Sequence, residues 1–155
     1  MLSVPKQELN GQFAMLPMDD VHFGAGSVEK LGTALEQYDV KRAVIITGNS
    51  LAQKTDLVAK VEAAAGGRTV GVFSETSQHV PRETVIAAAD FARAKNADAI
   101  ISFGGGTPND TAKAVTICIA ENISEPDGLD AMRIKFEYPD KLEIPSLSAD
   151  PLPMF

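Results

Sequence analysis

Short apolar runs alternate with amphipathic segments along most of this chain. The runs at residues 43–47, 69–73 and 98–103 are rich in Val, Ile and other apolar residues and are each followed by Gly or Ser, a pattern typical of buried strands. A shorter run at residues 21–23 predicts a further strand. Because the main runs are apolar rather than alternating, they predict parallel strands covered by helices on both faces.

Helical spacing of apolar residues fills the intervals between these runs. Helices are expected at residues 27–38 and 50–65, and after Pro81 and Thr107. The resulting order, β-α-β-α-β-α-β-α, predicts an α/β fold. We expect a doubly wound, mainly parallel, Rossmann-like sheet with helices on both faces and right-handed crossovers.

Two of the expected helices begin with residue pairs typical of N-termini. Ser50 and Gln53 have the spacing of a capping box, and so do Thr107 and Asp110. Pro108 would then occupy the first helical position, which proline favours. We therefore expect Thr107 to be the N-cap residue, and the spacing alone favours a structural role for the Asp110 carboxylate.

The pattern changes after about residue 122. From Glu121 onward there are eight acidic against three basic residues, and five of the nine prolines lie there. Only residues 132–138 predict regular structure, an exposed strand. The sequence thus predicts an α/β domain at residues 1–122, with its core from about residue 21, followed by an acidic, Pro-rich extension at residues 123–155.

Composition narrows the classes of function. A chain of 155 residues is long enough for one domain with a buried core. A net charge of −7 excludes a broad cationic surface for nucleic acid or an anionic membrane. No apolar run could span a bilayer, the N-terminus lacks the features of a signal peptide, and Cys118 is the one cysteine. We expect a cytoplasmic protein without disulfides.

Three consecutive glycines, Gly104, Gly105 and Gly106, join the third main run to the following helix. Glycine lets the backbone turn sharply and lets a ligand approach it closely. A helix N-terminus offers unpaired N–H groups and a positive dipole end to an anion. This segment predicts a phosphate cradle. The alternative is that the glycines form only a tight strand-to-helix turn.

Other candidate groups are weaker. Lys113 could reach a phosphate or carboxylate, although a solvated helix residue is the simpler interpretation. The glycines around residue 25 lack the third glycine of the dinucleotide fingerprint, because position 29 is Glu. His22 and His79 have no neighbouring His or Cys and predict no metal site. Cys118 lies among apolar residues and is expected in the core.

Residues 100–115, Ile-Ile-Ser-Phe-Gly-Gly-Gly-Thr-Pro-Asn-Asp-Thr-Ala-Lys-Ala-Val, closely resemble a signature segment of the iron-containing alcohol dehydrogenases, a family that shares its fold with dehydroquinate synthase. Residues 23–31 resemble the family's first strand and helix, and residues 42–47 its second strand. Residues 79–85 resemble the maleylacetate reductase side of the family. The resemblance covers roughly residues 21–122.

This resemblance implies a nicotinamide-dependent oxidoreductase that acts on an alcohol, aldehyde or ketone. In the family, the N-terminal half binds NAD or NADP, and a helical C-terminal half holds Fe²⁺ or Zn²⁺. By carry-over, Gly105, Gly106 and Thr107 would contact the pyrophosphate, and Asp110 would lie near the nicotinamide. The full set of residues expected to hold the cofactor is Gly48, Asn49, Ser50, Gly104, Gly105, Gly106, Thr107, Asp110 and Lys113.

The chain departs from the family at the end of the second strand. Many members carry an acidic residue there that holds the ribose hydroxyls, whereas this chain has Gly48, Asn49 and Ser50. Without a carboxylate to repel a 2′-phosphate, NADP is expected to bind at least as well as NAD.

The second departure concerns the metal. By the resemblance, the family continues beyond this sequence into a metal-binding domain, and its Asp and His ligands have no counterparts here. We therefore expect little or no dehydrogenase turnover from this polypeptide alone. An exposed sheet edge would favour a homo-oligomer or a complementing C-terminal chain. The alternatives are a catalytically silent nucleotide- or phosphate-binding module and a dehydroquinate synthase relative, which residues Ala112-Lys113 argue against.

Overall fold

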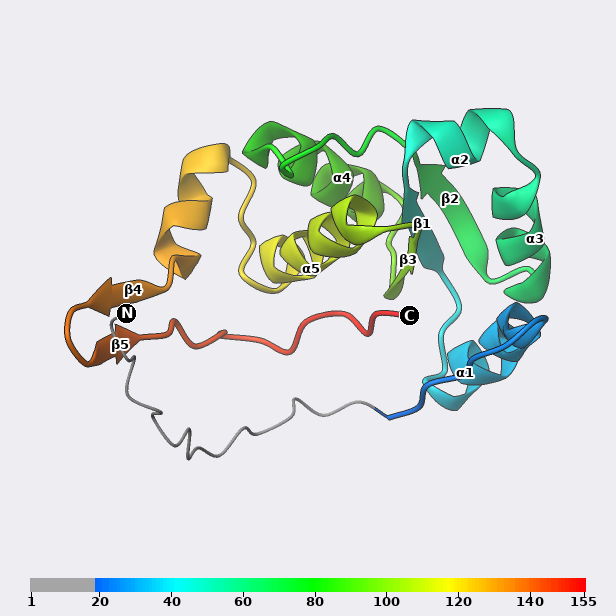
Figure 1. Ribbon diagram of the computed structural model, residues 1–155, viewed down its shortest axis with the longest axis horizontal. Helices are drawn as coiled ribbons and strands as arrows, with labels where there is room; N and C mark the ends of the chain where they lie inside the picture. Colours follow the sequence, from blue (N-terminus) through cyan, green and yellow to red (C-terminus); the bar gives the residue numbers. More distant parts are fainter. Residues whose placement is uncertain (1–18) are drawn as a thin grey trace, which may run out of the picture.

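A parallel three-stranded sheet forms the centre of the computed structural model, which describes residues 19–155. The strands are β1 (Ala43–Thr47), β2 (Thr69–Phe73) and β3 (Ala99–Phe103), in the order β2-β1-β3 (Figure 1). β1 pairs in parallel with both neighbours. The predicted parallel sheet is confirmed.

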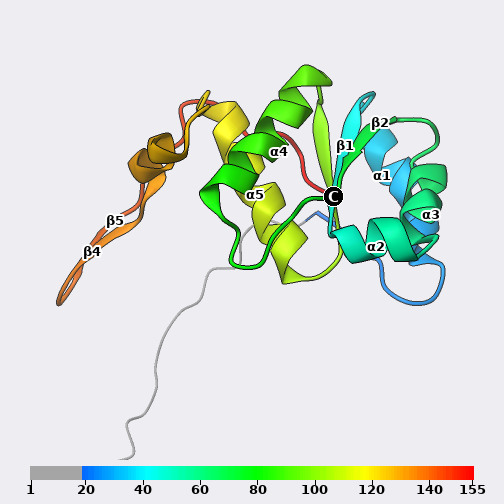
Figure 2. The same cartoon turned by 90° about the horizontal axis from the view of Figure 1, so that it is seen from above.

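Helices cover both faces of this sheet, so the doubly wound α/β prediction is confirmed (Figure 2). Along β1, Val44 and Ile46 pack in one core cluster, and Ala43 and Ile45 pack in a second. The first cluster includes residues of α4 (Arg82–Ala94) and α5 (Gly106–Ala120). The second includes residues of α1 (Leu31–Gln37) and α3 (Leu57–Ala64), with the short helices η1 (Ser27–Lys30) and α2 (Asn49–Lys54) beside them.

The chain after α5 contains a short helix and a hairpin. These are η2 (Pro126–Met132) and the antiparallel strands β4 (Lys135–Glu137) and β5 (Lys141–Glu143). The exposed strand expected within residues 132–138 is confirmed as β4. The last residues then run along β3: the Phe155 N–H donates to the Ile100 carbonyl at 2.9 Å, and the Ser102 N–H donates to the Phe155 carbonyl at 2.8 Å. Part of the sheet edge that was expected to be exposed is therefore covered.

Two predictions of local structure are wrong. Residues 21–23 form no strand, because no residue within 19–155 pairs with them and the Val21 and Phe23 side chains are exposed; strand propensity without a neighbouring ladder does not specify a strand. The helix expected at residues 50–65 is two helices, separated by extended backbone at Thr55. The Thr55 hydroxyl donates to the Leu51 carbonyl at 2.6 Å and accepts from the Leu57 N–H at 3.3 Å, which ends one helix and begins the next.

The capping box expected at Ser50 and Gln53 is also absent. The N-cap residue of α2 is Gly48, two residues before Ser50, and no side chain caps the helix. Residues 1–18, on which the expectation about a signal peptide depends, lie outside the described part of the chain. Within residues 19–155, no helix has the length and apolar character needed to cross a membrane.

An ion pair attaches η2 to the start of α4. Arg82 Nη2 lies 2.6 Å from Asp130 Oδ1, and the guanidinium holds the pKa of the Asp130 carboxyl below its usual value of 3.8. A depressed pKa in the folded state means that the pair stabilises the fold above pH 3.8 and that this contribution is lost as the pH falls through the lowered pKa.

We expect an NMR titration of the Asp130 carboxyl carbon to give a midpoint below 3.8, and the Arg82→Gln variant to return it towards 3.8, since the charged partner is then removed. The control is Lys60→Gln, which removes the ion-pair partner of Asp56 instead and should leave the Asp130 midpoint unchanged. Equal midpoints in the wild type and in Arg82→Gln would contradict this account of the ion pair.

Candidate functional site

The carboxyl ends of β1 and β3 lie side by side at one edge of the sheet. Thr47 pairs with Phe103, so Gly48 and Gly104 both follow at that edge. The helix after β1 covers one face of the sheet and the helix after β3 covers the other. This divergence is a topological switch point, the place where doubly wound sheets bind ligands.

Gly104 makes the turn from β3 into α5. Its φ is 142°, and a Cβ placed on it would lie 2.7 Å from Pro108 Cγ and 3.3 Å from Leu51 Cδ1. No side chain fits there. Because Leu51 belongs to α2, the same contact brings the start of α2 against the start of α5. The loops after β1 and β3 are therefore neighbours in the structure.

Gly105 and Gly106 differ from Gly104. A Cβ placed on either residue would meet no atom within 4 Å, and both residues are exposed. Gly105 has a negative φ of −90°, which any residue adopts. The turn itself thus requires one glycine, whereas the next two leave open space above the first turn of α5.

The N-terminus of α5 has no side-chain cap. The helix begins at Gly106 with Gly105 as the N-cap residue, so the prediction that Thr107 caps it is wrong. The sharp turn at Gly104 starts the helix early and places Thr107 inside the first turn, where its carbonyl accepts the Thr111 hydroxyl at 2.8 Å. The N–H groups of the first helical turn have no intrahelical acceptor. Since no side chain caps this end of α5, the N–H groups of Gly106 and Thr107 are not occupied by a capping side chain.

Asp110 is therefore not part of a capping box. Its carboxylate lies 3.4 Å from the Lys113 ammonium, and both side chains are exposed. An exposed pair of this kind contributes little to stability. Both groups stay accessible, Asp110 about one helical turn and Lys113 about two turns beyond Gly106.

The loop after β1 also carries an acidic neighbour that sequence reasoning missed. Asn49 and Ser50 are exposed at the start of α2, as expected of ligand-facing residues. Gly48 pairs in an isolated antiparallel bridge with Glu75, an exposed residue two positions after the end of β2. The sequence pattern identifies the residues that follow β1, but it carries no signal for the register of the loop after β2.

One buried polar atom lies at the same end of β1. The Thr47 hydroxyl has no hydrogen-bond partner among the described residues, while its carbonyl accepts the Thr76 hydroxyl at 2.9 Å. This second bond ties the loop after β2 to the end of β1. The loops after all three strands therefore meet at one edge.

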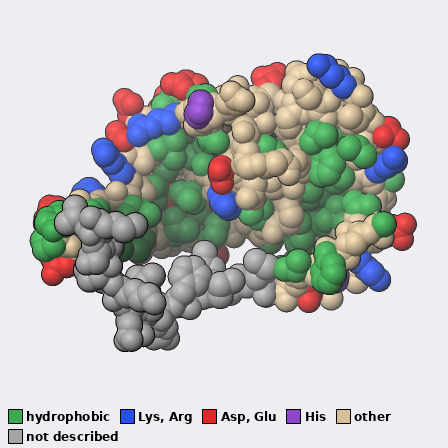
Figure 3. All heavy atoms as spheres, in the orientation of Figure 1, with side chains coloured by type: hydrophobic (Ala, Val, Ile, Leu, Met, Phe, Trp, Pro, Cys, Tyr) green, Lys and Arg blue, Asp and Glu red, His purple; other side chains and the backbone are tan. Residues whose placement is uncertain are grey.

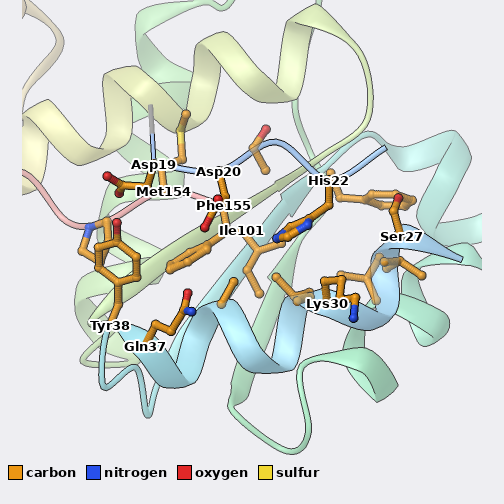
Figure 4. Close-up of a pocket in the computed structure, with 17 residues that line it drawn as sticks. Asp19, Asp20, His22, Ser27, Lys30, Gln37, Tyr38, Ile101, Met154 and Phe155 are labelled. Carbon is orange, nitrogen blue, oxygen red and sulfur yellow. The ribbon is translucent and has the colours of Figure 1, made fainter. Parts of the chain in front are cut away.

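A hollow of about 680 Å³ lies elsewhere, between α1, β3 and the last residues of the chain (Figure 4). Tyr38, Ile101 and Phe155 give it an apolar side, and His22 and Lys30 give it a polar one. None of the residues predicted to hold a cofactor lines it. The final residues form one wall of this hollow, and sequence patterns carry no signal for that placement.

Cys118 and His79 lie in the core and in a loop, as the sequence predicted. Cys118 is buried in the core, and burial raises the pKa of its thiol. His79 lies in an exposed loop. Within residues 19–155, no three His, Cys, Asp or Glu side chains gather in a way that could hold a metal ion.

Comparisons with known proteins agree on one family. The family model of the iron-containing alcohol dehydrogenases matches residues 19–150. A maleylacetate reductase of Sphingobium indicum is 36% identical over 97 residues, which cover 63% of this chain and 26% of that protein. An NAD-dependent methanol dehydrogenase of Bacillus methanolicus is 32% identical over 99 residues, with 63% and 26% covered. The match thus spans about a quarter of these relatives' length.

A solved structure shows the same fold. The alcohol dehydrogenase of an archaeal halo-thermophile from a Red Sea brine pool superimposes with a TM-score of 0.75 at 23% identity, covering 94% of this chain and 36% of that one. The sheet, the glycine turn and the signature segment agree with the match of the family model. This chain belongs to the iron-containing alcohol dehydrogenase family.

Proposed function

We propose that this chain supplies the dinucleotide-binding part of an oxidoreductase that transfers hydride between NAD(P) and a small alcohol, aldehyde or ketone. In this proposal, residues up to 122 form the dinucleotide-binding domain and residues 123–155 form an extension. The observation that carries it is the open, uncapped start of α5 at Gly105 and Gly106, at the switch point of a doubly wound sheet.

The pyrophosphate would be held mainly by backbone. Gly104 fixes the turn, and the N–H groups of Gly106 and Thr107 donate to phosphate oxygens where the helix dipole also favours negative charge. Without a Cβ at residues 105 and 106, a phosphate can approach these donors closely. A bound nicotinamide ring supplies the hydride donor or acceptor.

The other predicted residues have more peripheral roles in this proposal. Gly48, Asn49 and Ser50 lie where the adenosine ribose would be expected, at the end of β1. Lys113 adds positive charge about two helical turns beyond the phosphate position. Asp110 is placed towards the nicotinamide, with the Lys113 ammonium 3.4 Å from its carboxylate.

The family's Fe²⁺ or Zn²⁺ does not fit the donor set described here. Since residues 19–155 contain no cluster of metal-ligating side chains, we assign no step of the proposed reaction to a metal held by them. The proposed substrate class rests on the relatives, which are named as a maleylacetate reductase and a methanol dehydrogenase. We further propose that the 155-residue polypeptide binds the cofactor but turns over little alcohol by itself.

We expect NADP(H) to bind this chain at least as tightly as NAD(H). The residues directly after β1 are Gly48, Asn49 and Ser50, so this segment has no carboxylate of its own to repel a 2′-phosphate. Isothermal titration calorimetry with both cofactors measures the preference.

Glu75 provides the matched control for this comparison, because it is the acidic residue that pairs with Gly48. Glu75→Gln should leave NAD(H) binding unchanged and tighten NADP(H) binding by no more than about threefold. Tenfold tighter NAD(H) binding in the wild type would overturn the predicted preference. If Glu75→Gln then abolished that difference, Glu75 would be its cause.

A further inference from the structure

The β4–β5 hairpin presents an apolar face to solvent. Phe136 and Leu142 lie directly opposite each other, and Ile134 and Ile144 follow at a spacing of two, which places them on the same face. Their side chains are 63%, 55%, 59% and 66% exposed, respectively. Figure 3 shows hydrophobic side chains at the surface at this end of the molecule. Such a contiguous apolar patch marks an interaction surface.

The hairpin projects away from the helices α4 and α5 (Figure 2). A two-stranded sheet of this kind is marginally stable by itself in water. Within residues 19–155, no further strand pairs with the outer edges of β4 and β5, and the backbone N–H and C=O groups of such edges are a template for a further strand. A partner that adds a strand to the hairpin and covers its apolar face would stabilise the hairpin and pair these backbone groups.

On the opposite face of the hairpin each strand carries one basic and one acidic side chain: Lys135 and Glu137 on β4, and Lys141 and Glu143 on β5. Lys141 lies 3.1 Å from Glu137 and 3.4 Å from Glu143. Lys135 makes no ion pair within residues 19–155. A fitting partner would therefore bring a carboxylate to Lys135 while extending the sheet.

Residues 134–138 read Ile-Lys-Phe-Glu-Tyr, and this pattern is complementary to itself when reversed. If two β4 strands pair antiparallel about Phe136, each Lys135 faces Glu137 of the second copy, and each Ile134 faces Tyr138 of the second copy. Opposite charges and apolar pairs across strands both stabilise a sheet. The outer edge of β5 fits less well, since the same operation about Leu142 would set Asp140 against Ile144.

We propose that the hairpin is an interface between two copies of this chain, formed by antiparallel pairing of β4 with β4 of the second copy. The interface is isologous, with the same surface used by both copies. It joins the two sheets into four strands and stacks the apolar side chains of both hairpins on one face. The proposal is independent of cofactor binding.

Analytical ultracentrifugation of the 155-residue chain over a hundredfold range of concentration tests this. The wild type should show a reversible monomer–dimer equilibrium. Lys135→Glu alone places like charges opposite each other at both ends of the pair, as does Glu137→Lys alone. Each should raise the dimer dissociation constant at least tenfold, whereas Lys54→Glu, the same charge change at an exposed position on α2, should not.

An equimolar mixture of the Lys135→Glu and Glu137→Lys variants should restore the dimer, because opposite charges then face each other across the two chains. Each variant carries the same change within its own hairpin whether alone or mixed, so a damaged hairpin cannot account for the recovery. A wild type that remains monomeric throughout, as expected if a different partner covers the face, would overturn the proposal. So would a dimer that both variants leave intact, or a mixture that stays monomeric.

Discussion

Replacing Gly104 with alanine is expected to lower the free energy of unfolding by about 3 kcal/mol. Two costs add at this position. A φ of 142° is strained for any residue with a side chain, and the new methyl group would lie 2.7 Å from Pro108 Cγ. Pro108 is buried in the first turn of α5, so the helix start would have to shift. Urea unfolding followed by circular dichroism measures the loss.

The control is the adjacent residue. Gly105→Ala places its methyl group in open space at an ordinary φ, and its free energy of unfolding should stay within about 0.5 kcal/mol of the wild type. Equal stability of the Gly104 and Gly105 variants would contradict the geometry of the turn. Because Leu51 also contacts this position, the Gly104 variant should disturb α2 and weaken cofactor binding as well.

The strands of the sheet could be predicted from sequence almost to the residue. The runs at 43–47 and 69–73 match β1 and β2, because buried parallel strands are apolar on both faces. The third differs by one residue. Asp98 precedes β3, and its carboxylate accepts the Lys41 and Arg42 N–H groups at 2.8 Å each, a contact between residues far apart in the chain that no local pattern encodes.

Helix boundaries were predicted less well, since they depend on single hydrogen bonds. Thr55 divides a segment whose apolar spacing is continuous, because its hydroxyl competes for backbone groups. At Thr107 the capping pattern was present, but the turn at Gly104 moved the start of the helix upstream. Spacing alone could not tell that the turn would start the helix two residues before the predicted position.

At the candidate site, sequence located the glycine segment but could not assign a role to each glycine. The structure separates Gly104, which the turn requires, from Gly105 and Gly106, which it does not. The bridge between Gly48 and Glu75 and the contact of Phe155 with β3 depend on how loops cross the sheet edge. Such contacts follow from tertiary packing rather than from periodicity.

The second large effect concerns these two open glycines. Replacing both Gly105 and Gly106 with alanine is expected to weaken dinucleotide binding at least about tenfold, which corresponds to about 1.4 kcal/mol. The two methyl groups would occupy the space through which a phosphate must reach the N–H groups at the start of α5. Stability should be unchanged or slightly higher, since alanine is the better helix former at residue 106.

The proposal that a dinucleotide binds at the start of α5 is tested by calorimetric titration of NAD(H) and NADP(H) into the wild type and into the Gly105→Ala/Gly106→Ala variant. Unfolding curves of both proteins are recorded alongside. We expect saturable binding of one dinucleotide per chain to the wild type, and at least tenfold weaker binding to an equally stable variant. A wild type that binds neither cofactor, or a stable variant that binds as tightly as the wild type, would contradict the proposal.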